Sequence, residues 1–317
     1  MCNSKISHLK IASLHGHDDR SDGFNKTIDN VLAAKDKGLY GLGITNHGTC
    51  SGLVLHSTSC KEHNIVPILG CEFYTRLPNE LNEKTDNSAS GRFHITFLAS
   101  GKEGYDRLIA INNDAHKNIE ISRGAKYPIA TWDMFKEHAG NGLIVLTGCV
   151  ASVTFHDEIT IAYEYIDFLT TTFGKNNVYA EVQPHEINRR GIPINSYQRP
   201  LQLAEKFDLK TVWTNDFHAA TEKDLPLLEM YTKATKGYSF TAGYIQSADE
   251  MFIEACKVIG EEKAIKAFEG INEIVTRMET NGSIDFHNDF ELPNAKDEVE
   301  HLLHYWQEAL ERDLKAN

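Results

Sequence analysis

Short apolar, β-branched runs alternate with longer helical patterns from residue 8 to about residue 236 of the chain. This alternation is typical of repeated βα units arranged around a parallel sheet. The runs predict strands at Leu9–His15, Tyr40–Thr45, Val66–Tyr74, Phe93–Ala99, Gly142–Thr147, Val178–Gln183 and Thr211–Thr214. Strands in this number indicate an α/β fold whose sheet closes, or nearly closes, into a barrel.

The segments between the predicted strands carry helical patterns. They predict helices at residues 27–37, 102–117, 132–138, 158–173, 194–207 and 222–236. After about Gly237 the alternation stops: residues 248–280 look mainly helical, and a last helix is predicted around residues 297–314. We therefore predict a barrel domain over residues 1–240 and a mainly helical extension over residues 241–317.

Charge and composition exclude several classes of protein. The net charge of −13 argues against a surface that grips nucleic acid over many phosphates. Divalent ions bound in a pocket would still reverse the local potential, so a nucleic-acid substrate stays open. There is no apolar run long enough to span a membrane and no basic-then-apolar leader, and the six cysteines are scattered singly. We expect a cytoplasmic protein with reduced thiols and no membrane partner.

Metal-binding residue types gather where the predicted strands end. In a parallel βα barrel, reactive groups lie at the carboxyl ends of the strands, because the βα loops build the pocket there. The residues that follow this rule are His15, His17, His47, Glu72, Cys149, Asp216 and His218. His94 is the exception because it begins its strand, so either that strand runs antiparallel or the barrel is distorted there.

Two pairs with period-two spacing are the strongest metal signals. His15 and His17 share one face of a strand, so both imidazoles can reach one ion, although a lone pair of this kind is more often structural. Asp216 and His218 repeat the spacing after the last strand, which lies beside the first in a closed barrel. Mixed imidazole and carboxylate ligands suit a multinuclear zinc or manganese site. Cys149 could also bind an ion as thiolate, but spacing alone favours its interpretation as a small buried residue beside Gly148.

Seven blocks of sequence carry a family resemblance. They read LHGHDDRSDG, ITNHGTCSG, VPILGCEFY, FHITFLASGKEGYDRL, GLIVLTGCV, EVQPHEINRR and TVWTNDFH, in this order. The chain resembles the polymerase-and-histidinol-phosphatase (PHP) domain found at the start of bacterial DNA polymerase III alpha subunits. The resemblance implies a distorted, TIM-like (β/α)7 barrel with a C-terminal helical extension. It also implies nine metal ligands, namely His15, His17, Asp22, His47, Glu72, His94, Cys149, Asp216 and His218.

The family pattern further implies how the ligands divide among ions. One ion takes His15, His17, Glu72 and Asp216, a second takes Glu72, His94 and Cys149, and a third takes Asp22, His47 and His218. The spacing from His17 to Asp22 is shorter than usual, so Asp18 or Asp19 could replace Asp22. Asn46 stands where the family usually has Asp, and we expect its amide to orient a neighbouring imidazole.

These residues predict metal-assisted hydrolysis of phosphate esters with two or three divalent ions, which could be zinc, manganese or iron. His15, His17, Asp216 and His218 are assigned to catalysis. Arg189 and Arg190 could clamp a phosphate oxygen, and His185 could serve as general acid or as support, although all three could also be surface residues.

Kinship to a replicative polymerase favours a 3′–5′ exonuclease acting on DNA ends. The alternatives are a small-molecule phosphatase of the histidinol-phosphatase type, which would take a nucleotide or phosphomonoester, and a non-catalytic module that binds a replication protein. We do not expect DNA synthesis by this chain.

Overall fold

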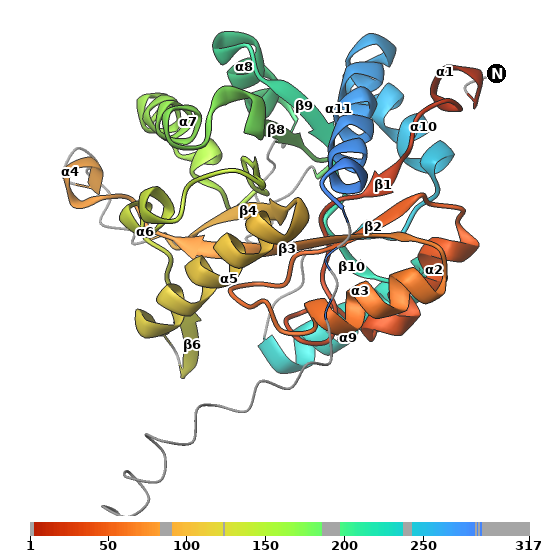
Figure 1. Cartoon of the computed structure of the whole chain (residues 1–317), viewed down its shortest axis with the longest axis horizontal. Helices are drawn as coiled ribbons and strands as arrows, with labels where there is room; N and C mark the ends of the chain where they lie inside the picture. The colour runs from red at the N-terminus through yellow and green to blue at the C-terminus, as the bar shows by residue number, and fades with distance from the viewer. Residues whose placement is uncertain are drawn as a thin grey trace, which may run out of the picture. The chain divides into compact units, whose positions relative to one another are not determined.

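One curled sheet of seven strands organises the computed structural model, which describes residues 3–82, 91–122, 124–185, 197–236 and 243–282, with residues 284 and 286 (Figure 1). Its strand order is β1-β2-β3-β4-β7-β8-β9. The strands are β1 Ala12–Ser13, β2 Gly41–Ile44, β3 Val66–Thr75, β4 Phe93–Ala99, β7 Leu143–Leu146, β8 Val178–Val182 and β9 Lys210–Trp213. The α/β class and all seven predicted strands are confirmed.

The strand β4 runs against its neighbours. It pairs antiparallel with β3 and with β7, whereas the other neighbouring pairs in the sheet are parallel. The beginning of β4 therefore lies at the same edge of the sheet as the carboxyl ends of the parallel strands. Of the two explanations for His94, an antiparallel strand is the one that the structure confirms.

A short strand outside the main sheet links the two ends of the curled sheet. The strand β10 (Phe217–Ala219) pairs with β11 (Gly243–Tyr244), and an isolated bridge joins Gly16 to Phe217. The backbone N–H of His17 donates to the carbonyl of Phe217 at 2.8 Å. Only glycine fits at residue 16, because a Cβ there would lie 2.0 Å from the Phe217 ring. This contact brings the ends of the first and last βα units together.

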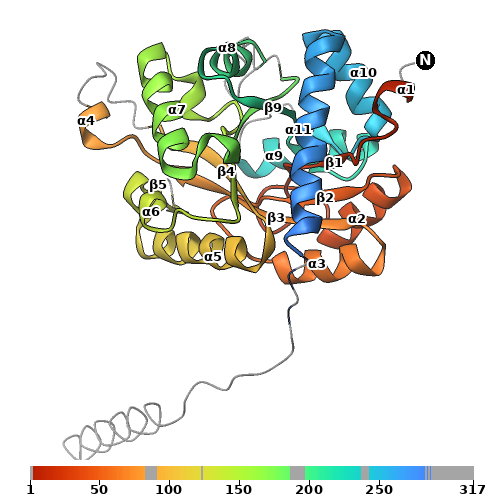
Figure 2. The same cartoon turned by 45° about the horizontal axis from the view of Figure 1, so that its top comes forward.

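Helices surround the sheet, as Figures 1 and 2 show. They are α1 Asn3–Ile6, α2 Thr27–Asp36, α3 Leu53–Glu62, α4 Asn79–Asn82, α5 Gly101–Lys117, α6 Trp132–Glu137, α7 Ile159–Phe173, α8 Gln198–Phe207 and α9 Leu225–Lys236. The sequence patterns missed α3 and the hairpin of β5 (Ile119–Ser122) and β6 (Ala125–Pro128). Across the described ranges, no helix combines the length and apolarity needed to cross a membrane.

Two helices of the predicted extension pack on the barrel. They are α10 (Ala248–Ile259) and α11 (Glu261–Thr280), separated by Gly260. Figures 1 and 2 both show α11 lying between β9 and β1, where the sheet has no ladder. Phe268, Ile271 and Val275 on α11 are fully buried in the main core. Residues 1–284 form one compact unit, and the domain boundary at residue 240 stays a prediction. The helix predicted at residues 297–314 lies outside the described residues.

Candidate metal centre

The nine side chains proposed as ligands converge at one edge of the sheet. His15, His17, His47 and Cys149 follow the ends of β1, β2 and β7, while Glu72, His94 and His218 lie within β3, β4 and β10, and Asp216 precedes β10. The side chains of His15, His17 and Glu72 have no exposed surface. Three groups, whose ligand atoms lie within 4.8 Å of one another in each, are His15–His17–Asp216, His47–Glu72–His94 and His17–Asp22–His47–His218.

The first group joins the two period-two pairs predicted from the sequence. Oδ1 of Asp216 lies 3.4 Å from Nε2 of His15 and 3.0 Å from Nε2 of His17. Asp216 has φ of +49°, a left-handed conformation that few residues other than Gly, Asn and Asp adopt readily. Such strain persists only where the surrounding structure holds it, and here it turns the carboxylate toward the two imidazoles.

Glu72 stands at the centre of the site. Its Oε2 atom lies 3.4 Å from Nε2 of His15, 3.3 Å from Nε2 of His17 and 2.8 Å from Nδ1 of His47. Its other oxygen, Oε1, lies 3.1 Å from Nδ1 of His94. A single carboxylate therefore faces four imidazoles from three separate segments, which is the arrangement that a bridging ligand between ions requires.

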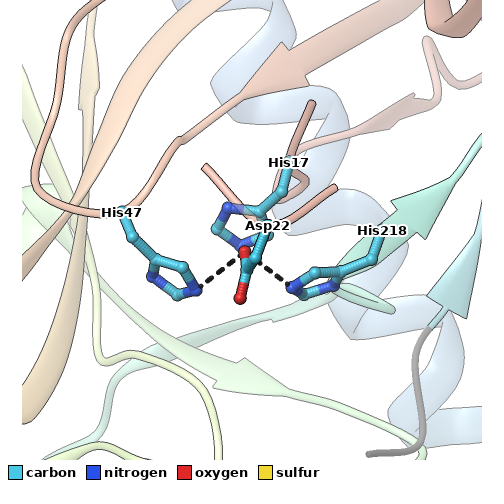
Figure 3. Close-up of side chains that lie close together, drawn as sticks. All are labelled: His17, Asp22, His47 and His218. Atoms are coloured by element: carbon cyan, nitrogen blue, oxygen red, sulfur yellow. Dashed lines mark ion pairs between the residues drawn. The ribbon is translucent and has the colours of Figure 1, made fainter. Parts of the chain in front are cut away.

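Asp22 lies between two histidines in the third group (Figure 3). Its Oδ1 atom is 3.3 Å from Nε2 of His47 and 3.3 Å from Nε2 of His218. The two alternatives face elsewhere: Asp18 accepts hydrogen bonds from Arg20, Thr27 and Asn46, and the Asp19 side chain is 43% exposed. Among the three aspartates, Asp22 is the one whose carboxylate points at the imidazoles.

Cys149 lies beside His94, with Sγ 3.5 Å from Nδ1 of that imidazole. Gly148, which precedes it, has φ of +96°, and a Cβ there would come within 2.5 Å of the His94 carbonyl oxygen. This tight turn directs the thiol toward the site. Burial raises the pKa of Cys149, and the carboxylates of Glu72 and Asp216 raise it further, so the thiol stays protonated unless a cation stabilises the thiolate.

The unsatisfied polar atoms of the pocket fit a set of cations. Nε2 of His15 and His17, both ring nitrogens of His47, Oε2 of Glu72 and Oδ1 of Asp216 are buried and make no hydrogen bond to the described residues. Two ligands of a tetrahedral zinc ion at bond lengths of ~2.0–2.1 Å stand about 3.3 Å apart. The 3.0–3.4 Å separations around Asp216 and Asp22 match that spacing. Imidazole, carboxylate and thiol donors together suit zinc, manganese or iron.

The buried histidines and carboxylates shift one another's pKa values. Burial lowers the pKa of His47, but Asp22 and Glu72 outweigh it and raise that pKa to about 10. Burial also lowers the pKa of His15, which Glu181, Asp216 and Glu72 nonetheless raise well above its ordinary value. The histidines in turn overcome burial to hold the pKa values of Glu72 and Asp22 well below the usual range. Carboxylates that stay ionised when buried and that raise the pKa of neighbouring imidazoles would also attract cations.

Glu181 supports the site and was missed by sequence reasoning. This buried residue of β8 accepts hydrogen bonds at Oε1 from Nδ1 of His15 at 2.6 Å and from Oγ1 of Thr214 at 2.6 Å. Gln183 Nε2 donates to the same oxygen at 3.1 Å. A proton held on Nδ1 leaves the Nε2 lone pair of His15 directed at the pocket. A glutamate within the apolar run VYAEV is the signal that could have revealed it, because unpaired buried carboxylates are rare.

Asn46 acts on the site less directly than expected. Its Oδ1 accepts from Oγ of Ser21 at 2.8 Å, and that hydroxyl lies 3.4 Å from Nδ1 of His17. Its amide nitrogen donates to Oδ1 of Asp18 at 2.8 Å. Among the described residues, Asn46 therefore reaches an imidazole through Ser21 and not directly, and it also holds the loop that carries Asp22.

The predicted substrate-binding residues divide into two cases. His185 is buried, not on the surface, and it lies close enough to Asp216, His218 and His15 for their charges to influence it. Burial lowers its pKa, so the imidazole is neutral near pH 7. Arg189 and Arg190 lie outside the described residues.

A distorted α/β barrel with a buried cluster of histidines and carboxylates at one end defines the general class of this protein. Residues 13–185 match the sequence model of the PHP domain, which covers more than half of the chain. The chain therefore belongs to the PHP family, as the resemblance of the seven blocks indicated.

The chain is similar to one part of much longer proteins. The chain is 27% identical over 223 residues to the DNA polymerase III alpha subunit of Aquifex aeolicus, a match that covers 67% of this chain and 18% of that protein. It is 30% identical over 223 residues to an error-prone DNA polymerase of Cutibacterium acnes, covering 68% of this chain and 19% of the polymerase. The chain thus spans about a fifth of the length of these relatives.

A solved structure with a similar chain trace is that of a candidate metal-dependent phosphoesterase from Bifidobacterium adolescentis, with a TM-score of 0.44 and 14% identity. The match covers 79% of this chain and 97% of that chain. Membership of the PHP family rests on the sequence match.

Proposed function

We propose that this protein is a metal-dependent phosphoesterase that binds two or three divalent ions and acts as a 3′–5′ exonuclease on DNA ends. The observation that carries the proposal is the position of Glu72, whose two oxygens lie within 3.4 Å of nitrogens from His15, His17, His47 and His94. A carboxylate shared among four imidazoles of three segments can link neighbouring ions in one pocket.

We assign the ligands in three overlapping groups. His15, His17, Glu72 and Asp216 would hold one ion, Glu72, His94 and Cys149 a second, and Asp22, His47 and His218 a third, with His17 also within reach of the third group. Bound ions would lower the pKa of water and offset the charge that develops on phosphate oxygens.

The protein's own groups position the reaction. Glu181 keeps the Nδ1 proton of His15, so that Nε2 faces the pocket. Neutral His185 can accept a proton or donate its N–H to a phosphate oxygen beside Asp216. Cys149 is buried and assigned to an ion, so it is not free to act as a nucleophile, which favours attack by water.

The names of the relatives favour a nucleic-acid substrate, since both are DNA polymerases. A small phosphomonoester is the second candidate, favoured by the net charge of −13 and by the complete burial of His15, His17 and Glu72. An acidic protein would repel a long polyanion, whereas a compact phosphate can enter a pocket lined by cations.

Metal content and product release test the proposal together. We expect mass spectrometry to find at least two divalent ions per chain, and manganese- or zinc-dependent release from a 3′-labelled single strand to exceed release from p-nitrophenyl phosphate. Asp216→Asn should reduce turnover at least a hundredfold, roughly the effect of losing one group that stabilises developing charge. Asn tolerates the left-handed backbone, so the fold should persist. Fewer than two ions and no release from any substrate would remove the enzyme hypothesis.

A further inference from the structure

The β5–β6 hairpin is attached to β3 close to the proposed ligands. An isolated bridge joins Tyr74, at the end of β3, to Ile129 just after β6, and Ala130 N donates to the Tyr74 carbonyl at 2.9 Å. Arg76 Nε donates to Oε2 of Glu120 on β5 at 3.0 Å. The hairpin is therefore attached to the strand that carries Glu72, two residues before Tyr74.

A continuous series of ring contacts leads from the proposed ligands to this hairpin. Tyr74 lies on the same face of β3 as Glu72, and its ring stacks on His47 with centroids 5.6 Å apart. The Tyr127 ring on β6 meets Tyr74 edge to face at 5.2 Å. The guanidinium of Arg92 lies 3.7 Å from the centroid of Tyr127. Tyr127 and Arg92 are both half-buried, so this stack is partly open to solvent.

The hairpin also carries cations in an acidic protein. Residues 119–128 (IEISRGAKYP) contain one arginine and one lysine against one glutamate, while the whole chain has a net charge of −13. Lys126 is exposed next to Tyr127. Aromatic rings interleaved with cations are the combination that binds single-stranded nucleic acid, because bases stack on the rings and phosphates pair with the cations.

We propose that Tyr127 and Arg92 form a stacking platform for a base of a single-stranded nucleic acid whose end lies in the metal pocket. This inference rests on the proposed phosphoesterase function. The platform is joined to the pocket through Tyr74 and His47, so a strand held there lies directly beside the ligand cluster. Tyr127 and Arg92 are positioning residues, and they favour oligonucleotides over phosphomonoesters that lack a base.

The test compares Tyr127→Ala, Arg92→Ala and Tyr127→Phe in the metal-loaded full chain. The substrates are a 3′-labelled single strand and the same strand with abasic residues near its 3′ end. We expect both alanine variants to raise KM for the first strand by about fivefold to a hundredfold, the range for loss of one stacked base, with kcat nearly unchanged. Tyr127→Phe should restore the KM, and on the abasic strand the variants and wild type should be equal.

Tyr163→Ala is the matched control, because this tyrosine of α7 also lies under a cation, with Lys206 Nζ 4.4 Å from its ring centroid. It should leave both substrates unaffected. Metal content and thermal unfolding of each variant show whether the fold and the pocket are intact, and Arg92→Ala tests the platform if Tyr127→Ala does not fold.

A binding measurement separates this inference from the proposed function. The probe is a single strand that carries the fluorescent base 2-aminopurine near its 3′ end, with a phosphorothioate at that end to slow cleavage. Its fluorescence should fall when it binds wild type, because the base stacks, and the fall should be smaller with Tyr127→Ala. Cleavage by wild type with no difference in either alanine variant would overturn the platform and leave the phosphoesterase proposal standing. An equal defect on the abasic strand would also overturn it. Tyr127-dependent quenching without cleavage of any substrate would support the platform and refute the hydrolase.

Discussion

Replacing Glu181 tests how far a residue outside the ligand set controls the metal centre. Its Oε1 accepts three hydrogen bonds, from His15 Nδ1 at 2.6 Å, Thr214 Oγ1 at 2.6 Å and Gln183 Nε2 at 3.1 Å. The side chain is buried, so no water replaces these bonds freely. Glu181→Gln keeps the shape but removes the charge, and Glu181→Ala also leaves the His15 N–H without its acceptor.

The size of the effect follows from the bond that changes. A hydrogen bond to a charged group contributes about 1.5–3 kcal/mol and a neutral one about 0.5–1.5 kcal/mol, so losing the charge costs roughly 1–1.5 kcal/mol. We expect Glu181→Gln to weaken binding of the ion held by His15 about tenfold, and Glu181→Ala to weaken it toward a hundredfold. The ions assigned to His94 and to His218 should bind as in wild type.

The assay is competition against a chromogenic chelator at several free-zinc concentrations, with metal per chain measured by mass spectrometry. Glu103→Gln, an exposed carboxylate that pairs with Arg107 on α5, is the control and should titrate like wild type. The reasoning fails if Glu181→Gln keeps wild-type affinity for every ion while remaining folded, because His15 would then not depend on its partner.

Two further predictions concern pH and metal preference. The His47 pKa of about 10 lies above its unfolded value, so its protonated form stabilises the chelator-treated protein below pH about 6.5, and this contribution is lost as pH rises through about 10. Between pH 7 and 10, the Tm of chelator-treated wild type should thus fall more than the Tm of chelator-treated His47→Gln. Parallel plots of Tm against pH for the two proteins would contradict the raised pKa of His47. The second prediction is that Cys149→Ser weakens zinc binding more than manganese binding, because thiolate prefers the softer ion, and equal losses in a metal titration would show that Cys149 is not a ligand.

The fold was largely predictable because strands buried on both faces leave a strong local signal. β2, β7 and β8 are buried throughout, and each appears in the sequence as an uninterrupted run of mostly apolar residues. The missed elements lack that signal: α3 contains polar residues that are buried, including His56 and Ser57, and the β5–β6 hairpin is largely exposed. Burial of His56 lowers its pKa to about 4, so it acts as a neutral core residue.

The candidate site was predictable in part. Residues whose partners are close in the sequence could be recognised, and residues whose partners are far away in the sequence could not. His15 with His17, and Asp216 with His218, are visible as local pairs at strand ends. Asp22, His94 and Cys149 came from the family resemblance, since nothing in their own surroundings marks them as ligands. Glu181 and Tyr127 escaped both approaches, because their partners lie far away in the sequence.

The sequence by itself predicted which residues could bind metal and determined on which strands most of them lie, because period-two spacing and strand ends are local properties. Only the tertiary structure decided that β4 runs antiparallel and brings His94 to the site, and that Asp22 rather than Asp18 or Asp19 faces the imidazoles. It also decided that imidazoles from three other segments meet at Glu72. Such convergence depends on strand pairing between residues that are distant in the chain, which local sequence patterns do not specify.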